Sequence, residues 1–63
     1  MQLETTDEII GIKEIAELLG VVRGTVDAWR WRGVLVEPDG AASGRPLWHR
    51  DTILEWARQT GRL

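Results

Sequence analysis

The sequence predicts a mainly α-helical domain with one small β-hairpin, in the order helix, turn, helix, hairpin, helix. Two observations carry this prediction. Apolar residues recur every three or four positions over 12–19 and again over 23–32, and Gly20 separates the two segments. After Gly33 this period is lost, and β-branched residues and turn signals follow until a further helical pattern begins near residue 52.

The first helix is expected over residues 12–19, where five apolar residues form one stripe: Ile12, Ile15, Ala16, Leu18 and Leu19. Gly11 stands at the N-cap position, and the side chain of Glu14 can reach back to its N–H. Gly20 follows the last apolar residue and can adopt the left-handed conformation that ends many helices.

A second helix is expected over 23–32, after a very short connection, and Gly33 ends it. We expect Val22, Val26 and Trp29 to face inward from this segment. Two short helices joined by a tight, glycine-containing turn are typical of a helix-turn-helix.

The hairpin is expected to begin with a strand at Val34–Val36, followed by the turn signal Asp39-Gly40. Residues 40–45 then form a slim loop, and 45–48 return as the second strand. Because Pro46 has no N–H, this second strand is expected at an edge of the sheet.

The third helix is expected over 52–60, with Asp51 as its N-cap and Gly61 at its end. One face of this helix carries Ile53, Trp56, Ala57 and Thr60.

The composition indicates one small domain of 63 residues that holds together without covalent or metal cross-links. A chain of this length buries only about 60% of the surface of its unfolded form. There is no Cys, which excludes disulfides and thiolate metal sites and is consistent with a reducing cytoplasm. We expect the core to form around Trp29, Trp48 and Trp56, with Leu35 packed against them. No apolar run approaches the ~20 residues of a membrane span.

Charge is distributed unevenly along the chain, whose net charge is −2. The first 20 residues carry an excess of acid, from Glu4, Asp7, Glu8, Glu14 and Glu17. Residues 1–9 are expected to form a flexible acidic arm, and residues 10–63 the folded domain. Residues 21–50 carry five arginines and an excess of positive charge. Nucleic-acid binding needs a local positive face rather than a basic total, so the composition permits it.

Both halves of the chain carry patterns of one known family. The run Ile12-Lys13-Glu14-Ile15-Ala16-Glu17-Leu18-Leu19-Gly20-Val21, followed by Thr25-Val26, Trp29, Gly33 and Leu35, resembles the winged-helix DNA-binding domain of MerR-like proteins. The end of the chain, with Gly44-Arg45, Trp48, Asp51 and Glu55-Trp56, is similar to the version found in phage excisionases, which are recombination directionality factors. Two positions depart from the family pattern, because Val22 replaces a capping Ser or Thr and Ala28 replaces a basic or polar residue.

The resemblance implies a winged helix-turn-helix that binds double-stranded DNA sequence-specifically. Excisionases resemble architectural cofactors: several copies bind tandem sites, bend the DNA and direct an integrase toward excision. A small phage or bacterial transcriptional regulator of the same fold is the alternative. The acidic balance keeps a third possibility open, a protein-interaction adaptor.

Ten residues are candidate DNA contacts: Arg23, Gly24, Thr25, Asp27, Ala28, Arg30, Arg32, Ser43, Arg45 and Arg50. Arg23 can pair with guanine, and Thr25 can touch a phosphate or a thymine methyl group. Asp27 can accept from cytosine or hold Arg23 in place. Arg30 and Arg32 are expected on phosphates, and Arg45 in or beside the minor groove.

Trp31 cannot share the inward face of Trp29, so its indole is expected to be exposed. It can stack on a residue of the wing, lie on the DNA backbone, meet a second copy of the chain or pack against the C-terminal segment. Head-to-tail contacts between copies on DNA are a further expectation, with the acidic residues of the first third facing Arg50, Arg58 and Arg62 of the next copy.

Catalysis is not expected. Ser43, His49 and Asp51 supply the residue types of a hydrolytic triad, but a hairpin tip cannot provide the buried, oriented geometry of one. A lone His without Cys provides no usual zinc site, and Gly40 and Gly44 do not form a phosphate-binding loop. We therefore expect no enzyme activity, cofactor, metal, membrane partner or small-molecule ligand.

Overall fold

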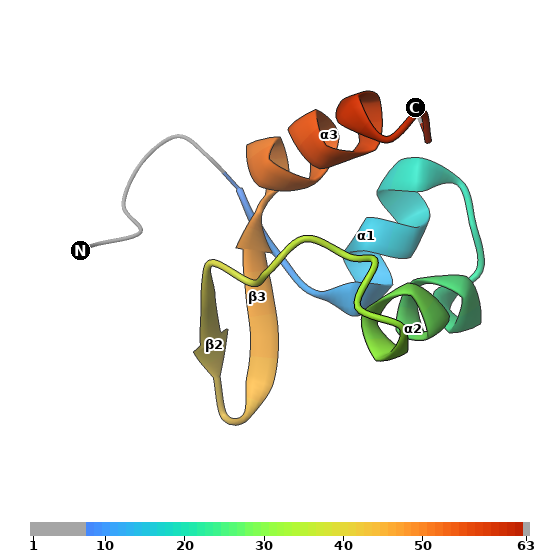
Figure 1. Ribbon diagram of the computed structural model, residues 1–63. Coiled ribbons are helices and arrows are strands. Elements are labelled where there is room, and N and C mark those ends of the chain that lie inside the picture. Colours follow the sequence, from blue (N-terminus) through green and yellow to red (C-terminus); the bar gives the residue numbers. More distant parts are fainter. Residues whose placement is uncertain (1–7, 63) are drawn as a thin grey trace.

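The computed structural model describes residues 8–62, which form three helices and a three-stranded antiparallel sheet (Figure 1). In chain order the elements are β1 (Ile9–Ile10), α1 (Ile12–Leu19), α2 (Arg23–Trp31), β2 (Gly40–Ala42), β3 (Arg45–His49) and α3 (Arg50–Gln59). In Figure 1, α3 lies at the top, and α2 and the tip of the β2–β3 hairpin lie below it. The predicted order of helix, helix, hairpin and helix is confirmed, and β1 is an addition that the sequence did not reveal.

The first helix, α1, has the bounds and both ends that its sequence predicts. The N–H of Gly11 donates to Oε1 of Glu14 at 3.0 Å, which satisfies one of the donors at the start of the helix. Gly20 has φ of 72° and ends the helix in the left-handed conformation. Ile15 and Ala16 are buried on its inner face.

The second helix, α2, departs from prediction at its first residues. Val22 is its N-cap, makes no side-chain cap, and is 71% exposed, so the expectation that it faces inward is wrong. The reason is that Val22 lies before the first helical turn, in extended backbone, and does not follow the helical period of Val26 and Trp29. Val26 is fully buried, and Trp29 is half-buried against the core.

The predicted strand at Val34–Val36 is wrong, because these residues form a loop whose carbonyls bind tryptophan side chains. Nε1 of Trp48 donates to the carbonyl of Val36 at 2.9 Å, and Nε1 of Trp56 donates to that of Val34 at 3.2 Å. The indole N–H groups thus satisfy backbone carbonyls that, in a strand, would accept hydrogen bonds from a neighbouring strand.

The hairpin lies further along the chain than predicted, with β2 in the segment expected to be its loop. Ala42 pairs with Arg45, and the turn consists of Ser43 and Gly44, with φ of 53° and 77°. Positive φ at both turn residues is the geometry that matches the twist of a two-residue hairpin.

The sheet order is β1-β3-β2, so the prediction of β3 as an edge strand is wrong. Pro46 is nevertheless tolerated in this central strand. β1 pairs only with Trp48 and His49, and on the other side Pro46 pairs with Ala41, next to the Ala42–Arg45 pair at the turn. Pairs that alternate along a hairpin with the hydrogen-bonded ones need no N–H, so Pro46 leaves no ladder bond unmade.

The third helix, α3, begins at Arg50, two residues before its predicted start, and its N-cap is His49 rather than Asp51. The chain passes from β3 into α3 without a linker, so the last strand residue is also the cap. The backbone N–H of His49 donates to Oδ2 of Asp39, and that of Arg50 to the carbonyl of Glu8, both at 2.8 Å. Asp51 lies in the first turn, where a carboxylate still favours the helix dipole.

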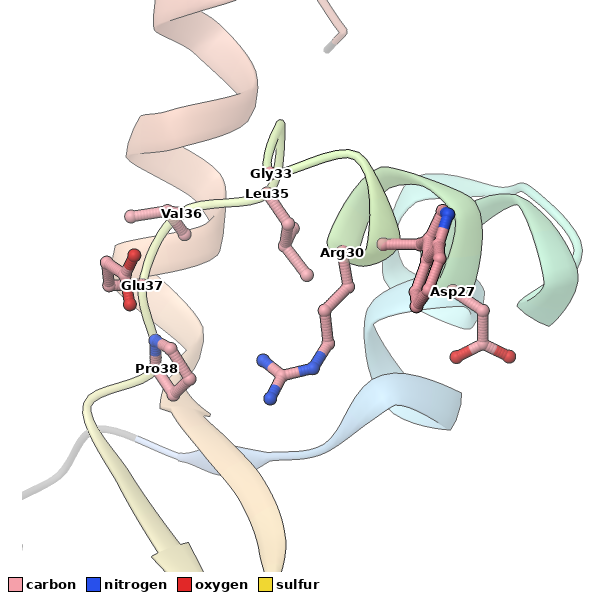
Figure 2. A pocket seen from close by; sticks show the side chains of 8 residues that line it. Asp27, Arg30, Gly33, Leu35, Val36, Glu37 and Pro38 are labelled. Atoms are coloured by element: carbon pink, nitrogen blue, oxygen red, sulfur yellow. The ribbon is translucent and has the colours of Figure 1, made fainter.

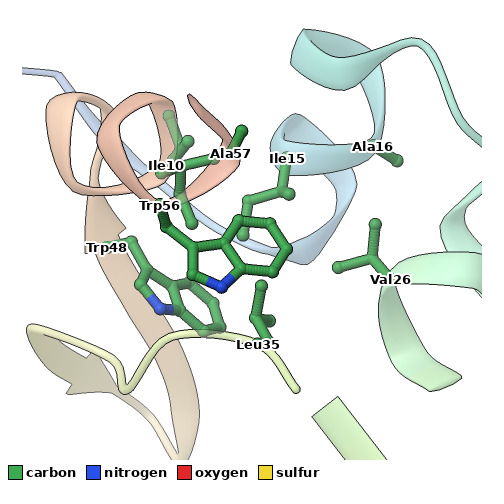
Figure 3. Packing of buried hydrophobic residues seen from close by; sticks show 9 residues of the cluster. Ile10, Ile15, Ala16, Val26, Leu35, Trp48, Trp56 and Ala57 are labelled. Carbon is green, nitrogen blue, oxygen red and sulfur yellow. The ribbon is translucent and has the colours of Figure 1, made fainter. Parts of the chain in front are cut away.

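A single apolar core joins the helices to the sheet, and Trp48, with no exposed area, is its largest fully buried side chain (Figure 3). Among residues 8–62, nine are buried: Ile10, Ile15, Ala16, Val26, Leu35, Trp48, Ile53, Trp56 and Ala57. Trp29 contacts Trp56 edge-on, with 5.4 Å between ring centroids. The predicted core is therefore confirmed for Leu35, Trp48 and Trp56, and Trp29 packs at its border.

Most of the predicted acidic arm over 1–9, including Glu4 and Asp7, lies outside the described residues. Its last residue, Ile9, is in β1 and pairs with His49. None of the helices within residues 8–62 has the length and apolar character needed to cross a membrane.

Candidate nucleic-acid interface

The outer face of α2 presents its predicted contact residues to solvent. Arg23, Gly24, Asp27 and Ala28 are exposed, and Thr25 is half-buried. These residues belong to the first two turns of the helix. They face outward because Val26 and Trp29 occupy the opposite, core-facing side. Gly24 and Ala28 leave this face without bulky side chains, so another molecule can approach the helix closely.

Trp31 continues this face at the end of α2 and is 89% exposed. The predicted exposure of its indole is confirmed, and the alternative of packing against the C-terminal segment is excluded for the described residues. The C-terminal segment instead uses Arg62, whose guanidinium lies 5.0 Å from the ring centroids of both Trp29 and Trp56. An exposed indole of this size is an apolar contact surface for another molecule.

Arg30 occupies a hollow of about 490 Å³ between α2 and the segment that leads to the hairpin. The hollow is lined by Asp27, Arg30, Trp31, Gly33, Leu35, Val36, Glu37 and Pro38. Figure 2 shows the side chain of Arg30 reaching from α2 toward the side of Pro38, while the side chain of Asp27, which is exposed, extends away from Arg30. The guanidinium carbon of Arg30 lies 5.9 Å from the ring centroid of Trp48, so the core partly fixes its position.

A second hollow, of about 580 Å³, brings the start of α2 and the hairpin together. We call it the basic hollow, because Lys13, Arg23 and Arg45 all line it. Its remaining lining residues are Glu8, Ile9, Gly11, Ile12, Glu14, Pro46 and Leu47. Within residues 8–62, none of its three cations forms an ion pair with a carboxylate.

The tip of the hairpin carries the other predicted contact, Ser43. Its side chain is exposed, and it stands in the turn that separates β2 from β3. Arg45 follows two residues later, at the start of β3, and is exposed as well. Ser43 and Arg45 are therefore both presented by the hairpin, as predicted.

Arg32 and Arg50 are not brought together with the others. Arg32 is the exposed C-cap of α2 and lines neither of the two hollows. Arg50 begins α3 and lines a third hollow with Glu8, Glu14 and Glu17, and its Nε lies 3.9 Å from Oε1 of Glu8. Arg50 thus lies among acidic side chains rather than beside α2.

The sequence reasoning did not select Lys13, which the structure places in the basic hollow. Lys13 is the only basic residue among the first 20 residues, where acidic residues are in excess. Its position in the first turn of the predicted first helix was visible, but its nearness to the hairpin depends on β1 and on the packing of β3 against it. No local sequence pattern shows that pairing.

The residues named for catalysis or metal binding do not form a site in the described chain. Ser43 is at the hairpin tip, while His49 and Asp51 flank the start of α3. Within residues 8–62 there is no group of three or more His, Cys, Asp or Glu side chains placed to hold a metal ion. The interface of α2 and the hairpin is therefore the feature on which a functional argument can be built.

The chain matches no protein-family model, no curated protein and no solved structure.

Proposed function

We propose that this protein is a winged helix-turn-helix that binds double-stranded DNA, with α2 in the major groove and the β2–β3 hairpin as the wing. The observation that carries the proposal is the basic hollow, in which Arg23 of α2 and Arg45 of β3 lie on one surface. Neither arginine is neutralised by a carboxylate of residues 8–62. A helix and a hairpin that share a positive surface can straddle one strand of a duplex, each in its own groove.

The exposed face of α2 fits this role by its residue types. Thr25 and Asp27 lie in its first half, from which recognition helices reach base edges. Gly24 and Ala28 allow the helix backbone to approach the bases. Arg30 and Arg32 lie near its C-terminal end, where they can contact phosphates and fix the register of the protein on the duplex.

The hairpin fits the role of a wing. Its two-residue turn is narrow, and Ser43 and Arg45 are exposed near the tip. Arg side chains favour narrow minor grooves, whose negative potential is enhanced. The hairpin would therefore respond to the shape of the DNA rather than to base identity.

The biological role that we propose is that of an architectural cofactor of the excisionase kind, without catalysis of its own. Copies bound at tandem sites would bend the DNA and direct an integrase toward excision. A transcriptional regulator with the same DNA contacts is the alternative. The two are distinguished by whether the protein changes the products of an integrase on its attachment sites or only the level of a transcript.

The experiment that tests DNA binding is selection of duplexes from a random library, followed by affinity measurement on the selected duplex over a range of salt. Each phosphate contact should contribute about 0.9 to the slope of log affinity against log salt. We expect enrichment of a defined sequence and a slope of several units. Failure to enrich any sequence, together with salt-independent or undetectable binding, would refute the proposal.

A protein-interaction adaptor is the second candidate, and the 89% exposure of Trp31 is the observation that favours it. An adaptor would use Trp31 as an anchor in a partner's pocket. The duplex experiment separates the two, because an adaptor with an overall charge of −2 has no reason to bind DNA more tightly as salt falls.

A further inference from the structure

We infer that the basic hollow binds one phosphate of the DNA backbone, which Lys13, Arg23 and Arg45 contact together. This inference rests on the proposed function and assigns to it a residue, Lys13, from outside both the helix and the hairpin of the proposed interface. The three cations come from three elements, α1, α2 and β3, and line a single hollow. Their mutual repulsion is relieved when an anion lies between them.

The acidic side chains at the border of the hollow do not neutralise these cations. Glu14 accepts the N–H of Gly11 through Oε1, and Oε1 of Glu8 lies 3.9 Å from Nε of Arg50. Both glutamates also line the third hollow, on the side of Arg50. Their carboxylates therefore have partners within the chain, while Lys13, Arg23 and Arg45 form no ion pair with any described residue.

The remaining lining suits a sugar–phosphate chain better than a base. Gly11, Ile12, Pro46 and Leu47 add apolar surface to the hollow, on which a deoxyribose can pack. Among residues 8–62, none of the lining residues has a side-chain amide, the group with which proteins read adenine. Lys13 and the two arginines thus fix the position of the backbone, and Thr25 and Asp27 on the exposed side of α2 are left to read the bases.

The test uses the full chain and its selected duplex, in which one phosphate at a time is replaced by an uncharged methylphosphonate. For the wild-type protein, one such replacement should weaken binding roughly tenfold, as expected when charge-assisted hydrogen bonds are lost. Lys13→Gln, Arg23→Gln and Arg45→Gln should each bind the unmodified duplex more weakly, and each should be insensitive to that same replacement. Lys13→Arg keeps the charge and should retain the sensitivity.

Replacements at other phosphates serve as the matched control, because they should cost the variants as much as the wild type. Lys13 and Arg45 are exposed, and unchanged thermal unfolding of their variants shows that folding is preserved. The inference is overturned if the variants lose sensitivity at different phosphates, or if Lys13→Gln keeps the full wild-type sensitivity at every position. Those results would leave DNA binding itself intact. The proposed function would instead be refuted by the wild-type protein itself, if it enriched no sequence and showed salt-independent or undetectable binding to duplex DNA.

Discussion

At the scale of single residues, Trp48 and Trp56 differ in role from Trp31, as their hydrogen bonds and exposure show. The indole N–H groups of Trp48 and Trp56 bind the carbonyls of Val36 and Val34, so they join the core to the segment before the hairpin. A buried carbonyl that loses its donor is left unsatisfied, which costs more than the bond itself contributes. Trp31 has no such task and is 89% exposed.

We predict that Trp48→Phe lowers the free energy of unfolding by about 1–3 kcal/mol, because the carbonyl of Val36 loses its donor and the smaller ring leaves a gap. Trp31→Phe is the matched control and should change stability by less than about 0.5 kcal/mol. Urea unfolding followed by circular dichroism measures both. Equal stability of the two variants would show that the Trp48–Val36 bond does not hold the loop.

Asp27 is the residue of α2 whose substitution should change sequence preference rather than overall affinity. It points into solvent from the middle of the exposed face, where its carboxylate can accept from cytosine N4 (Figure 2). We predict that Asp27→Ala relaxes selection at one base position, with a loss of about 1–3 kcal/mol of discrimination.

Glu37→Ala provides the control for Asp27→Ala. Glu37 is also exposed and also lines the hollow that Arg30 occupies, but it belongs to the loop rather than to α2. Selection from a random library with each variant gives the comparison. An identical preferred sequence for wild type and Asp27→Ala would remove Asp27 from base recognition.

At the scale of elements, prediction from sequence succeeded where local chemistry determines structure. The apolar stripe of α1 and the glycines at its two ends are local features that mark where this helix begins and ends, and its bounds are as predicted. The first strand of the hairpin lies later in the chain than predicted, because its position depends on groups that are distant in the sequence. The indole N–H groups of Trp48 and Trp56 donate to the carbonyls of Val36 and Val34, respectively, and β3 pairs with β1, which lies far from it in the sequence.

The same distinction applies to the candidate interface. The exposed face of α2 could be predicted from helical periodicity once the inward side was known. The basic hollow could not, because it requires the start of α1 to meet β3. The surroundings of Arg50 could not be predicted either, because Glu8, Glu14 and Glu17, which line the third hollow with it, belong to segments far away in the sequence.

Helix α2 begins without a side-chain cap and has no acidic residue in its first turn, so a capping side chain at its start should stabilise it. Val22 has φ of −80° and ψ of 154°, the extended geometry of an N-cap residue, and is 71% exposed. A hydroxyl here can accept an N–H of the first turn, which valine cannot do. We predict that Val22→Ser raises the free energy of unfolding by about 0.5–2 kcal/mol.

Thermal unfolding measures this gain, which corresponds to about 4–8 °C for each kcal/mol in a domain of this size. Val34→Ser is the control, because Val34 is also exposed but lies in the loop, where a hydroxyl has no helix to cap. A melting temperature that falls in both variants would mean that Val22 packs against α2 more than its exposure indicates.

At the scale of the whole molecule, acidic and basic side chains are unevenly distributed. Glu8, Glu14 and Glu17 line the third hollow, while Lys13, Arg23 and Arg45 line the basic hollow, whose lining also includes Glu8 and Glu14. Two of the arginines expected to contact a neighbouring copy are engaged within the chain. Arg50 lies beside Glu8, and Arg62 stacks on Trp29 and Trp56. Of the three arginines expected at that contact, Arg58 remains exposed, so a contact between copies would use Arg58, the exposed acids and Trp31.

We predict that binding to DNA is cooperative, through contacts between copies on adjacent sites. A single small module buries only about 600–1,000 Å² on DNA, and the positive surface of this chain is small, so one copy should bind weakly. A contact between unlike faces does not close on itself, and it can repeat along a duplex. The acidic face of α1, which is formed by Glu14 and Glu17, is then available to the copy that follows.

Footprinting on duplexes with one site and with several tandem sites tests this prediction. We expect higher affinity per site on the tandem duplex and a Hill coefficient above one. Glu17→Gln, a change at an exposed position of α1, should lower that coefficient because it removes charge from the acidic face. The single-site duplex provides the reference affinity for each protein. Equal affinity per site on both duplexes would show that each copy binds alone, and the acidic face would then have no role in assembly on DNA.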